Sequence, residues 1–482
     1  MAAGLVATES ATVASRSLRG DLRAFDLIVV GTGAIIGVGW VIMVGAWLAA
    51  AGPGGTIVAF VLATVAVMFV GFCYGEMAAI APRAGGELIY AYVTLGLPAA
   101  YGIGWLIAFN LILICAFEAI AAGWLLESIF PALRIGTAYE LAGTSVSVGT
   151  LLIGLVGTVL IAALNARGSR SSARFQMTFT TTKLLLAVVL IALCIVHGNP
   201  ANLRPLFGGV DWRGSGPDWI GILTVLSQAP FFLGGFQVIP QLVEERTQGA
   251  RAGSIGVAIM ISLSVALCFY VGIAVAIAIV APRGSWLADQ LPAYTAVRVG
   301  LNSAWPGNAL LGIALLGTLS TWNAMFIWAT RLLFALSRAH LAPAYLSAQA
   351  GRAATPIGAI LFAAILSGCG ILPGRALLSS FVNSGSIVVA MAMLVTCICA
   401  WRLTRATTEL RRRVIIYCAT VVSGAILLIA IATPALRPSK IGIPVEWAVL
   451  LGWSVIIVAL WFANRRRCHA IDEPERRQRL LG

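Results

Sequence analysis

Charged side chains are scarce in this sequence, and their shortage excludes most soluble folds. Only 10% of the 482 residues are charged and 60% are hydrophobic, whereas an average soluble protein has about 25% charged residues. The mean hydropathy is correspondingly high, at +0.96. The composition therefore predicts an integral membrane protein, whose apolar side chains face the lipid bilayer.

Groups that form metal centres or catalytic clusters are few as well. The three histidines, His197, His340 and His469, are far apart in the sequence, and the nine cysteines are mostly scattered through apolar runs. The sequence contains no Gly-x-x-x-x-Gly-Lys-Ser/Thr motif for nucleotide phosphates. We therefore expect no metal site, no cofactor, no enzymatic activity and no ATP-driven pumping.

Apolar segments of membrane-spanning length are abundant. A helix needs about 20 apolar residues to cross a bilayer, and twelve segments meet this requirement. They lie near 25–50, 54–80, 98–127, 145–164, 175–197, 219–243, 254–281, 306–336, 356–373, 378–401, 412–433 and 444–463. The sequence predicts an all-α integral membrane protein with twelve transmembrane helices.

The basic residues indicate how the chain is oriented. The formal net charge is +14, which in a soluble protein would point to nucleic acid. With the N-terminus placed in the cytoplasm, the large majority of the 32 lysines and arginines fall on the cytoplasmic side. This asymmetry obeys the positive-inside rule. We therefore expect a multi-pass protein of the cell membrane with both termini cytoplasmic, and no nucleic-acid partner.

Two of the predicted spans contain residues that interrupt helices. The first span includes GTGAIIGVGW, residues Gly31–Trp40, with four glycines, and the sixth has Gly234, Gly235 and then Pro240. Glycine and proline weaken or break a helix. Both interruptions lie about ten residues, or about 15 Å, from the charged cytoplasmic end of their span, which is near the membrane midplane.

The interrupted spans hold matching places in two halves of five spans each. Such a pair is a pointer to a transporter site built on an inverted repeat, in which helices 1 and 6 are discontinuous. The predicted divisions are a cytoplasmic tail over 1–23, a first repeat (spans 1–5) over 24–197, an external loop over 198–218, a second repeat (spans 6–10) over 219–403, spans 11 and 12 over 404–464, and a cytoplasmic tail over 465–482. The spacing of Gly33 and Gly37 also fits close helix packing, which is the alternative.

Four stretches resemble motifs of the amino acid–polyamine–organocation (APC) permeases, and they occur in the family's order. They are GTGAIIGVG, GEMAAIAPRAGGELIYAYVTLG, GGFQVIPQLVEE, and ATRLLFALSRAHLAP followed by TPIGAI. The resemblance implies a five-plus-five inverted repeat with two extra helices. It also implies secondary transport of an amino acid by alternating access, as proton-coupled symport or exchange. A polyamine or another organic amine is the alternative substrate, and a channel is less favoured because no ring-forming filter sequence is present.

The resemblance also implies which residues bind the substrate. The implied residues are Ile35, Gly37, Val38 and Gly39 in span 1, Phe231, Gly234 and Gln237 in span 6, and Trp322 in span 8. Amides at the first interruption would meet a carboxylate, and carbonyl groups at both interruptions would meet an ammonium group. Gln237 replaces an acid of some relatives, which removes proton coupling through that position. Trp322 fits a core aromatic equally well.

Two ionisable residues, Lys183 and Glu118, lie deep inside predicted spans, where charge is costly and marks function. Lys183, about 14 Å into span 5, stands where sodium-coupled relatives bind sodium, so the hypothesis is that its protonation couples protons to transport. Glu118 in span 3 is a candidate acceptor for the ammonium group of a cationic side chain. The alternative for Lys183 is a side chain that snorkels or is paired structurally, and the alternative for Glu118 is a pair with a polar neighbour or a place in a water-filled vestibule. The oligomeric state and the particular substrate stay open.

Smaller features lie at the predicted cytoplasmic face. The resemblance implies gating salt bridges among Glu76, Arg83, Glu87, Glu244 and Glu245, and a solvated surface is the alternative. The Arg-Asp-Gly that is common near the end of span 8 is replaced by the residues from Arg338 to His340.

Overall fold

The protein is described by a computed structural model. The described residues are 23–83, 85–141, 143–208, 217–243, 254–287, 289, 291–350, 355–405, 409–436, 445–468 and 470–481. The predicted N-terminal tail, except its last residue, and the acidic residues Glu244 and Glu245 lie outside them.

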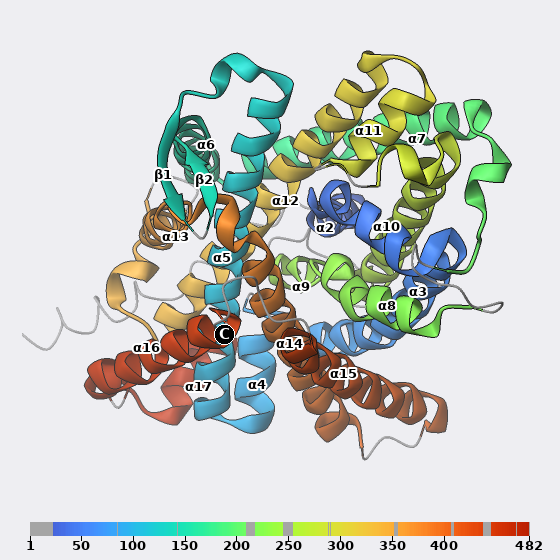
Figure 1. Cartoon of the computed structure of the whole chain (residues 1–482). Helices are drawn as coiled ribbons and strands as arrows, with labels where there is room; N and C mark the ends of the chain where they lie inside the picture. Colours follow the sequence, from blue (N-terminus) through green and yellow to red (C-terminus); the bar gives the residue numbers. More distant parts are fainter. Residues whose placement is uncertain are drawn as a thin grey trace, which may run out of the picture.

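Helices make up almost all of the described chain (Figure 1). They are α2 (Ala24–Ile35), α3 (Gly39–Ile80), α4 (Glu87–Leu95), α5 (Leu97–Ile129), α6 (Val148–Ala166), α7 (Ser169–His197), α8 (Trp219–Leu233), α9 (Val238–Gln241), α10 (Ser254–Val280), α11 (Pro292–Gly300), α12 (Ala304–Arg338), α13 (Ile357–Cys369), α14 (Leu378–Thr404), α15 (Leu410–Leu436), α16 (Val445–Cys468) and α17 (Glu473–Leu481). One short antiparallel hairpin, β1 (Thr137–Leu141) and β2 (Thr144–Ser147), precedes α6. The hairpin is a departure from the all-helical expectation.

Ten helices in the described part of the chain are long and apolar enough to cross a membrane. Two more apolar helices, α2 and α13, are shorter. The predicted spans 25–50 and 54–80 share α3, which bends sharply where Gly52 adopts φ +71° and Pro53 follows. The bend occurs there because glycine tolerates a left-handed conformation and proline has no N–H for the helical hydrogen bond.

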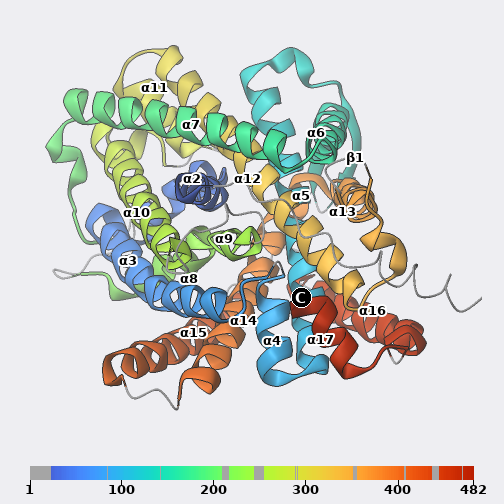
Figure 2. The same cartoon turned by 180° about the vertical axis from the view of Figure 1, so that it is seen from behind.

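Helix α2 lies in the middle of the helical assembly. It contacts α7, α9, α10 and α12, and Figure 2 shows α7 running across the molecule next to α2 and α12. Helix α3 packs against α8 and α10, and α5 packs against α12. Helices α15 and α16 lie at the periphery (Figure 1). The two segments with interrupting glycines are therefore both held at the centre.

Two of the four glycines of the first interrupted span have different functions. A Cβ on Gly33 would lie 2.2 Å from Gln176 Nε2 and 2.3 Å from Thr180 Oγ1 of α7, so Gly33 allows α2 and α7 to approach closely. Gly37 lies instead in the non-helical segment between α2 and α3. Close packing and an interruption, which stood as alternatives for this sequence, are thus both present, a few residues apart.

Candidate functional site

Two helix interruptions meet at the centre of the molecule. Helix α2 ends at Ile35 and α3 begins at Gly39, while α8 ends at Leu233 and α9 begins at Val238. Gly235 adopts φ +109° between α8 and α9, and a Cβ there would lie 2.7 Å from the carbonyl oxygen of Ala34. Only glycine permits this contact, because a side chain would collide with backbone.

A tyrosine from a third helix joins the two interruptions. The hydroxyl oxygen of Tyr270, in α10, lies 3.0 Å from the carbonyl oxygens of both Ile35 and Phe232. These carbonyls belong to the last turns of α2 and α8, which lack partners within their own helices. Tyr270 thereby fixes the two helix ends relative to each other.

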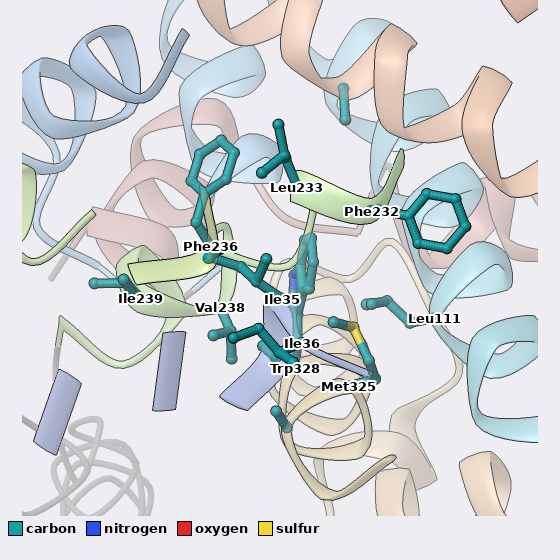
Figure 3. Packing of buried hydrophobic residues seen from close by; sticks show 14 of the residues in the cluster. Ile35, Ile36, Leu111, Phe232, Leu233, Phe236, Val238, Ile239, Met325 and Trp328 are labelled. Carbon is teal, nitrogen blue, oxygen red and sulfur yellow. The ribbon is translucent and has the colours of Figure 1, made fainter. Parts of the chain in front are cut away.

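A cavity of about 320 Å³ lies beside the interruptions. Residues of α2, α3, α5, α8, α10, α12 and α14 line it, and its volume is within the usual range for small-molecule sites. Figure 3 shows Ile35 and Ile36 at the end of α2, with Phe232 and Leu233 of α8 nearby and Met325 and Trp328 of α12 close to them. Most of the lining is apolar, so the few polar groups in it determine how a ligand is oriented.

Six of the predicted site residues line this cavity. They are Ile35, Gly37, Gly39, Phe231, Gly234 and Glu118. Because α3 starts at Gly39, its first amides lack intrahelical partners and carry the positive end of the helix dipole. An anionic group is stabilised at such a helix start.

Trp322 is placed elsewhere, which corrects the prediction that it belongs to the pocket. Thr321, Met325 and Trp328 line the cavity at spacings of four and three residues along α12, and a helix turns 100° per residue. Trp322 therefore faces another direction and is fully buried against Gly157 of α6. The aromatic side chain of α12 at the cavity is Trp328.

Gln237, which was predicted to bind the substrate, does not lie among the residues that line the cavity, whereas Val38 was expected to contribute only its backbone amide. The side-chain oxygen of Gln237 accepts a hydrogen bond from the amide of Gly235 at 2.8 Å, so it stabilises the turn between α8 and α9. The side chain of Val38 is fully buried. Val38 precedes the first residue of α3, so only its backbone remains near the interruption.

Lys183 lies against the interruption of the first span, on the side of α7. Its side chain is fully buried, and Nζ donates to the carbonyl oxygen of Gly33 at 3.3 Å, to Ser320 Oγ at 2.6 Å, and to the carbonyl oxygen of Ile36. The ammonium group thus occupies a place where backbone carbonyls of the unwound segment converge. Such oxygen-rich interruptions hold the coupling cation in related architectures.

Glu118 and Asn110 bring polar groups of α5 into the cavity. Both are 3% exposed. Glu118 Oε2 and Asn110 Oδ1 have no hydrogen-bond partner among the described residues. Sequence reasoning identified Glu118 but missed Asn110, although a lone amide within an apolar run of span 3 is the same kind of signal. Tyr270 and Trp328 were missed as well, because aromatic side chains are common in cores.

Two of the predicted gating residues, Glu76 and Glu87, form contacts other than the expected salt bridges with one another. Glu76 pairs with Arg412 of α15, and Arg83 is half-buried. Glu87, fully buried at the start of α4, accepts hydrogen bonds from the Tyr74 hydroxyl at 2.9 Å and from Gln241 Nε2 at 3.0 Å. Burial raises the pKa of Glu87 to about 7. Glu87 therefore joins α3, α4 and α9 through neutral partners.

Long apolar helices around a cavity, with two interrupted helices at its wall, define the class of membrane transport proteins. The sequence model of the amino acid permease family matches residues 22–465. The chain belongs to this family. Members of the family are amino acid transporters and not enzymes, so this protein transports amino acids. With its many long apolar helices, it is a multi-pass membrane protein.

Individual relatives agree with this membership. The branched-chain amino acid permease BcaP of Bacillus subtilis is 30% identical over 80% of this chain and 83% of its own length. A methylthioribose transporter of the same organism is 29% identical over 70% of this chain and 71% of its own. The aromatic amino acid transport protein AroP of Corynebacterium glutamicum is 25% identical over 77% of this chain and 79% of its own length.

Proposed function

We propose that the protein is a secondary active transporter that carries an amino acid by alternating access, either by proton-coupled symport or by exchange. Its architecture is twelve transmembrane helices, in which residues 24–197 and 219–403 form two inverted repeats of five. It resides in the cell membrane with both termini in the cytoplasm, as the distribution of basic residues supports.

The observation that carries this proposal is the cavity between the two interrupted helices. The helix start at Gly39 offers amides to the carboxylate of an amino acid, while the carbonyl ends of α2 and α8 lie on the same cavity and suit its ammonium group. An amino acid carries both charges on one carbon atom, so one site with both kinds of backbone group fits it.

Lys183 is the residue proposed to couple protons to transport. A protonated amine donates to the carbonyls of Gly33 and Ile36 and holds the interruption closed. A neutral amine loses most of this electrostatic attraction, so deprotonation loosens α2 from α7 and α12. Proton binding and the position of α2 are then linked.

Glu118 favours a second substrate class, an organic amine or a cationic amino acid. Glu118 lines the cavity, and its Oε2 atom has no partner in the described part of the chain, so its carboxylate would accept a charged donor. Human cationic amino acid transporter 4 is 26% identical over 67% of this chain, which adds support to this alternative.

Uptake into liposomes tests the proposed function. Purified protein would be reconstituted in ATP-free liposomes, and uptake of labelled amino acids and of putrescine would be followed with and without an inward proton gradient. We expect saturable amino acid uptake that the gradient accelerates, with protein-free liposomes as the control. Flux that rises linearly with concentration would indicate a channel, and saturable uptake of putrescine alone would indicate an amine transporter.

A further inference from the structure

Glu87 is a buried acid whose hydrogen-bond partners are neutral. It is fully buried at the first residue of α4, and its carboxyl oxygens lie 2.9 Å from the Tyr74 hydroxyl and 3.0 Å from Gln241 Nε2. It forms no salt bridge within the described part of the chain. Arg83 and the buried Arg331 of α12 are not among the groups that shift its pKa. Because a buried carboxylate without a cation is costly, the neutral acid is favoured here.

The contact between Glu87 and α9 requires close packing at the start of α4. The side-chain oxygen of Gln241, in α9, accepts a hydrogen bond from the amide of Gly85 at 3.0 Å. A Cβ on Gly86, which has φ +41°, would collide with Gln241 Nε2. The side chain of Gln241 is therefore bound at both of its polar atoms by the residues that begin α4.

Helix α9 extends this contact to the interruption of span 6. The turn before α9 contains Gly235, which lines the cavity, and Phe236. The ring of Phe236 packs edge-on against the ring of Tyr74, with 5.2 Å between the ring centroids. Glu87 thus binds the second part of the interrupted span through Gln241 and, by way of Tyr74, through Phe236.

A neutral Glu87 keeps both of its hydrogen bonds. One oxygen accepts from Gln241 Nε2, and the O–H group donates to the Tyr74 hydroxyl. Tyr74 then donates to Thr396 Oγ1 of α14, which lies beside it and is buried without a partner among the described residues. An ionised Glu87 also accepts from Tyr74 and Gln241, but its charge is buried without a cation. Ionisation therefore weakens the contact between α4 and α9.

Other titratable groups around α4 do not replace Glu87. Tyr90 of α4 interacts with Glu87, and Cys397 of α14 lies across Tyr74 from it. Both are neutral near pH 7. The charged groups that contact α4 from α14 and α17, Arg402 and Glu473, bind near the other end of the helix.

We propose that Glu87 is a positioning residue for transport, which holds α9 against α4 as a neutral acid and releases α9 when it ionises. The position of the span 6 interruption then depends on this proton. The inference goes beyond the proposed function and does not depend on Lys183.

The sign of the pH dependence follows from linkage. Burial raises the pKa of Glu87 from 4.5 to about 7, so the held state binds a proton more tightly than a released state in which the carboxyl meets water. The contact is strongest below about pH 4.5 and weakens as the pH rises through about 7. Within this window, opening becomes more favourable by up to about tenfold per pH unit.

Hydrogen exchange of the amides of residues 234–243, corrected for the intrinsic rate, tests this inference on the purified full chain. From about pH 5 to about pH 7, the protection of the wild type should fall at least about tenfold. Glu87→Gln has the shape and the hydrogen-bonding pattern of the neutral acid, so it should keep its protection. Glu76→Gln is the matched control, because Glu76 pairs with Arg412 and does not contact α9. It should lose protection as the wild type does.

Exchange of a labelled amino acid across liposomes provides the functional measurement. The pH is kept equal on both sides, and the maximal rate of Glu87→Gln is divided by that of the wild type, which cancels the effect of Lys183. We expect a ratio near one at about pH 5, where Glu87 is neutral. The ratio should fall at least about threefold by about pH 8, because only the wild type releases α9.

The outcomes separate this inference from the proposed function. Constant protection in the wild type, or a loss of protection that Glu87→Gln shares, would overturn the role of Glu87. A ratio of rates near one at every pH would overturn its role in transport. None of these results concerns the cavity or Lys183, so the proposed function would stand.

Discussion

Lys183 and Ser320 join α7 to α12 through a hydrogen bond of 2.6 Å at the point where the first interrupted span unwinds. The same ammonium group donates to the carbonyl oxygens of Gly33 and Ile36, and Thr321 Oγ1 donates to that of Gly33 at 2.9 Å. One amine therefore connects three helices. Because its hydrogen bonds to the carbonyls are charge-assisted, they depend on the proton that the amine carries.

Replacing Lys183 by alanine should abolish uptake driven by a pH gradient, because the protonated amine that binds the carbonyl groups of the interruption is removed. Uptake in liposomes, measured at several external pH values, checks this expectation. Ser320→Ala is the matched control: it removes one partner but keeps the amine, so its uptake should still respond to pH. Unchanged uptake with unchanged pH dependence in Lys183→Ala would refute the coupling role.

Gly235→Ala should destabilise the protein by about 1–3 kcal/mol, because the new Cβ meets backbone and the residue has a positive φ. It should also weaken amino acid binding, since the interruption of α8 would have to move away from α2. The control is Gly312→Ala in α12, where a Cβ meets no described atom within 4 Å. Thermal unfolding and binding of both variants, compared with the wild type, provide the measurement. Equal stability of the two variants would contradict the tight contact.

Glu118→Gln distinguishes the two substrate classes. If the carboxylate accepts a cationic side chain, the variant should lose at least about tenfold in affinity for arginine or putrescine and little for neutral amino acids. Binding of the two groups of substrates to the same purified variant is the measurement. An equal loss of affinity for cationic and neutral substrates would show that Glu118 affects the site as a whole and does not bind the substrate's side chain.

The docking of the C-terminal helix α17 should weaken as the pH falls below about 6.5. His340 Nδ1 lies 3.3 Å from the carbonyl oxygen of Arg467, and its Nε2 lies 2.8 Å from Arg479 Nη1 of α17. This arrangement requires a neutral ring that accepts from Arg479. Burial lowers the pKa of His340 below its ordinary value of 6.5, and the nearby charges of Arg479 and Arg467 lower it further, while Glu475 opposes them.

The sign of this pH dependence follows from linkage. The undocked histidine binds a proton more readily than the docked one, so docking is strongest above pH 6.5 and weakens as the pH falls toward the lowered pKa. Hydrogen exchange of α17 amides, corrected for the intrinsic rate, should show this loss of protection. His340 adopts φ +62°, which asparagine tolerates, so His340→Asn is the non-titrating control. An equal loss of protection in that variant would contradict the role of His340.

Several features could be predicted from the sequence because they depend on local properties. Hydropathy and length identified the apolar helices, and glycine and proline marked where two of them are interrupted. Lys183 and Glu118 stood out because charge is rare in apolar segments. Even so, the helix boundaries in the structure differ from the predicted ones. Helix α3 contains the second part of the predicted span 25–50 and the whole of the predicted span 54–80. Gly52 and Pro53 bend the chain between these parts without fully separating them.

The direction in which individual side chains point was decided only by the tertiary structure. Trp322 and Trp328 lie on the same helix, and which of them reaches the cavity depends on how α12 is rotated against its neighbours. Gln237 folds onto its own turn, and the side-chain oxygen of Asn110 packs against Gly385 of α14 without a hydrogen-bond partner in the described part of the chain. Apolarity and chain breaks are properties of a segment, so the sequence alone determined a membrane protein with two central interruptions. The lining of a cavity is a property of several helices at once, and their mutual rotation and spacing are set by packing, which no single segment encodes.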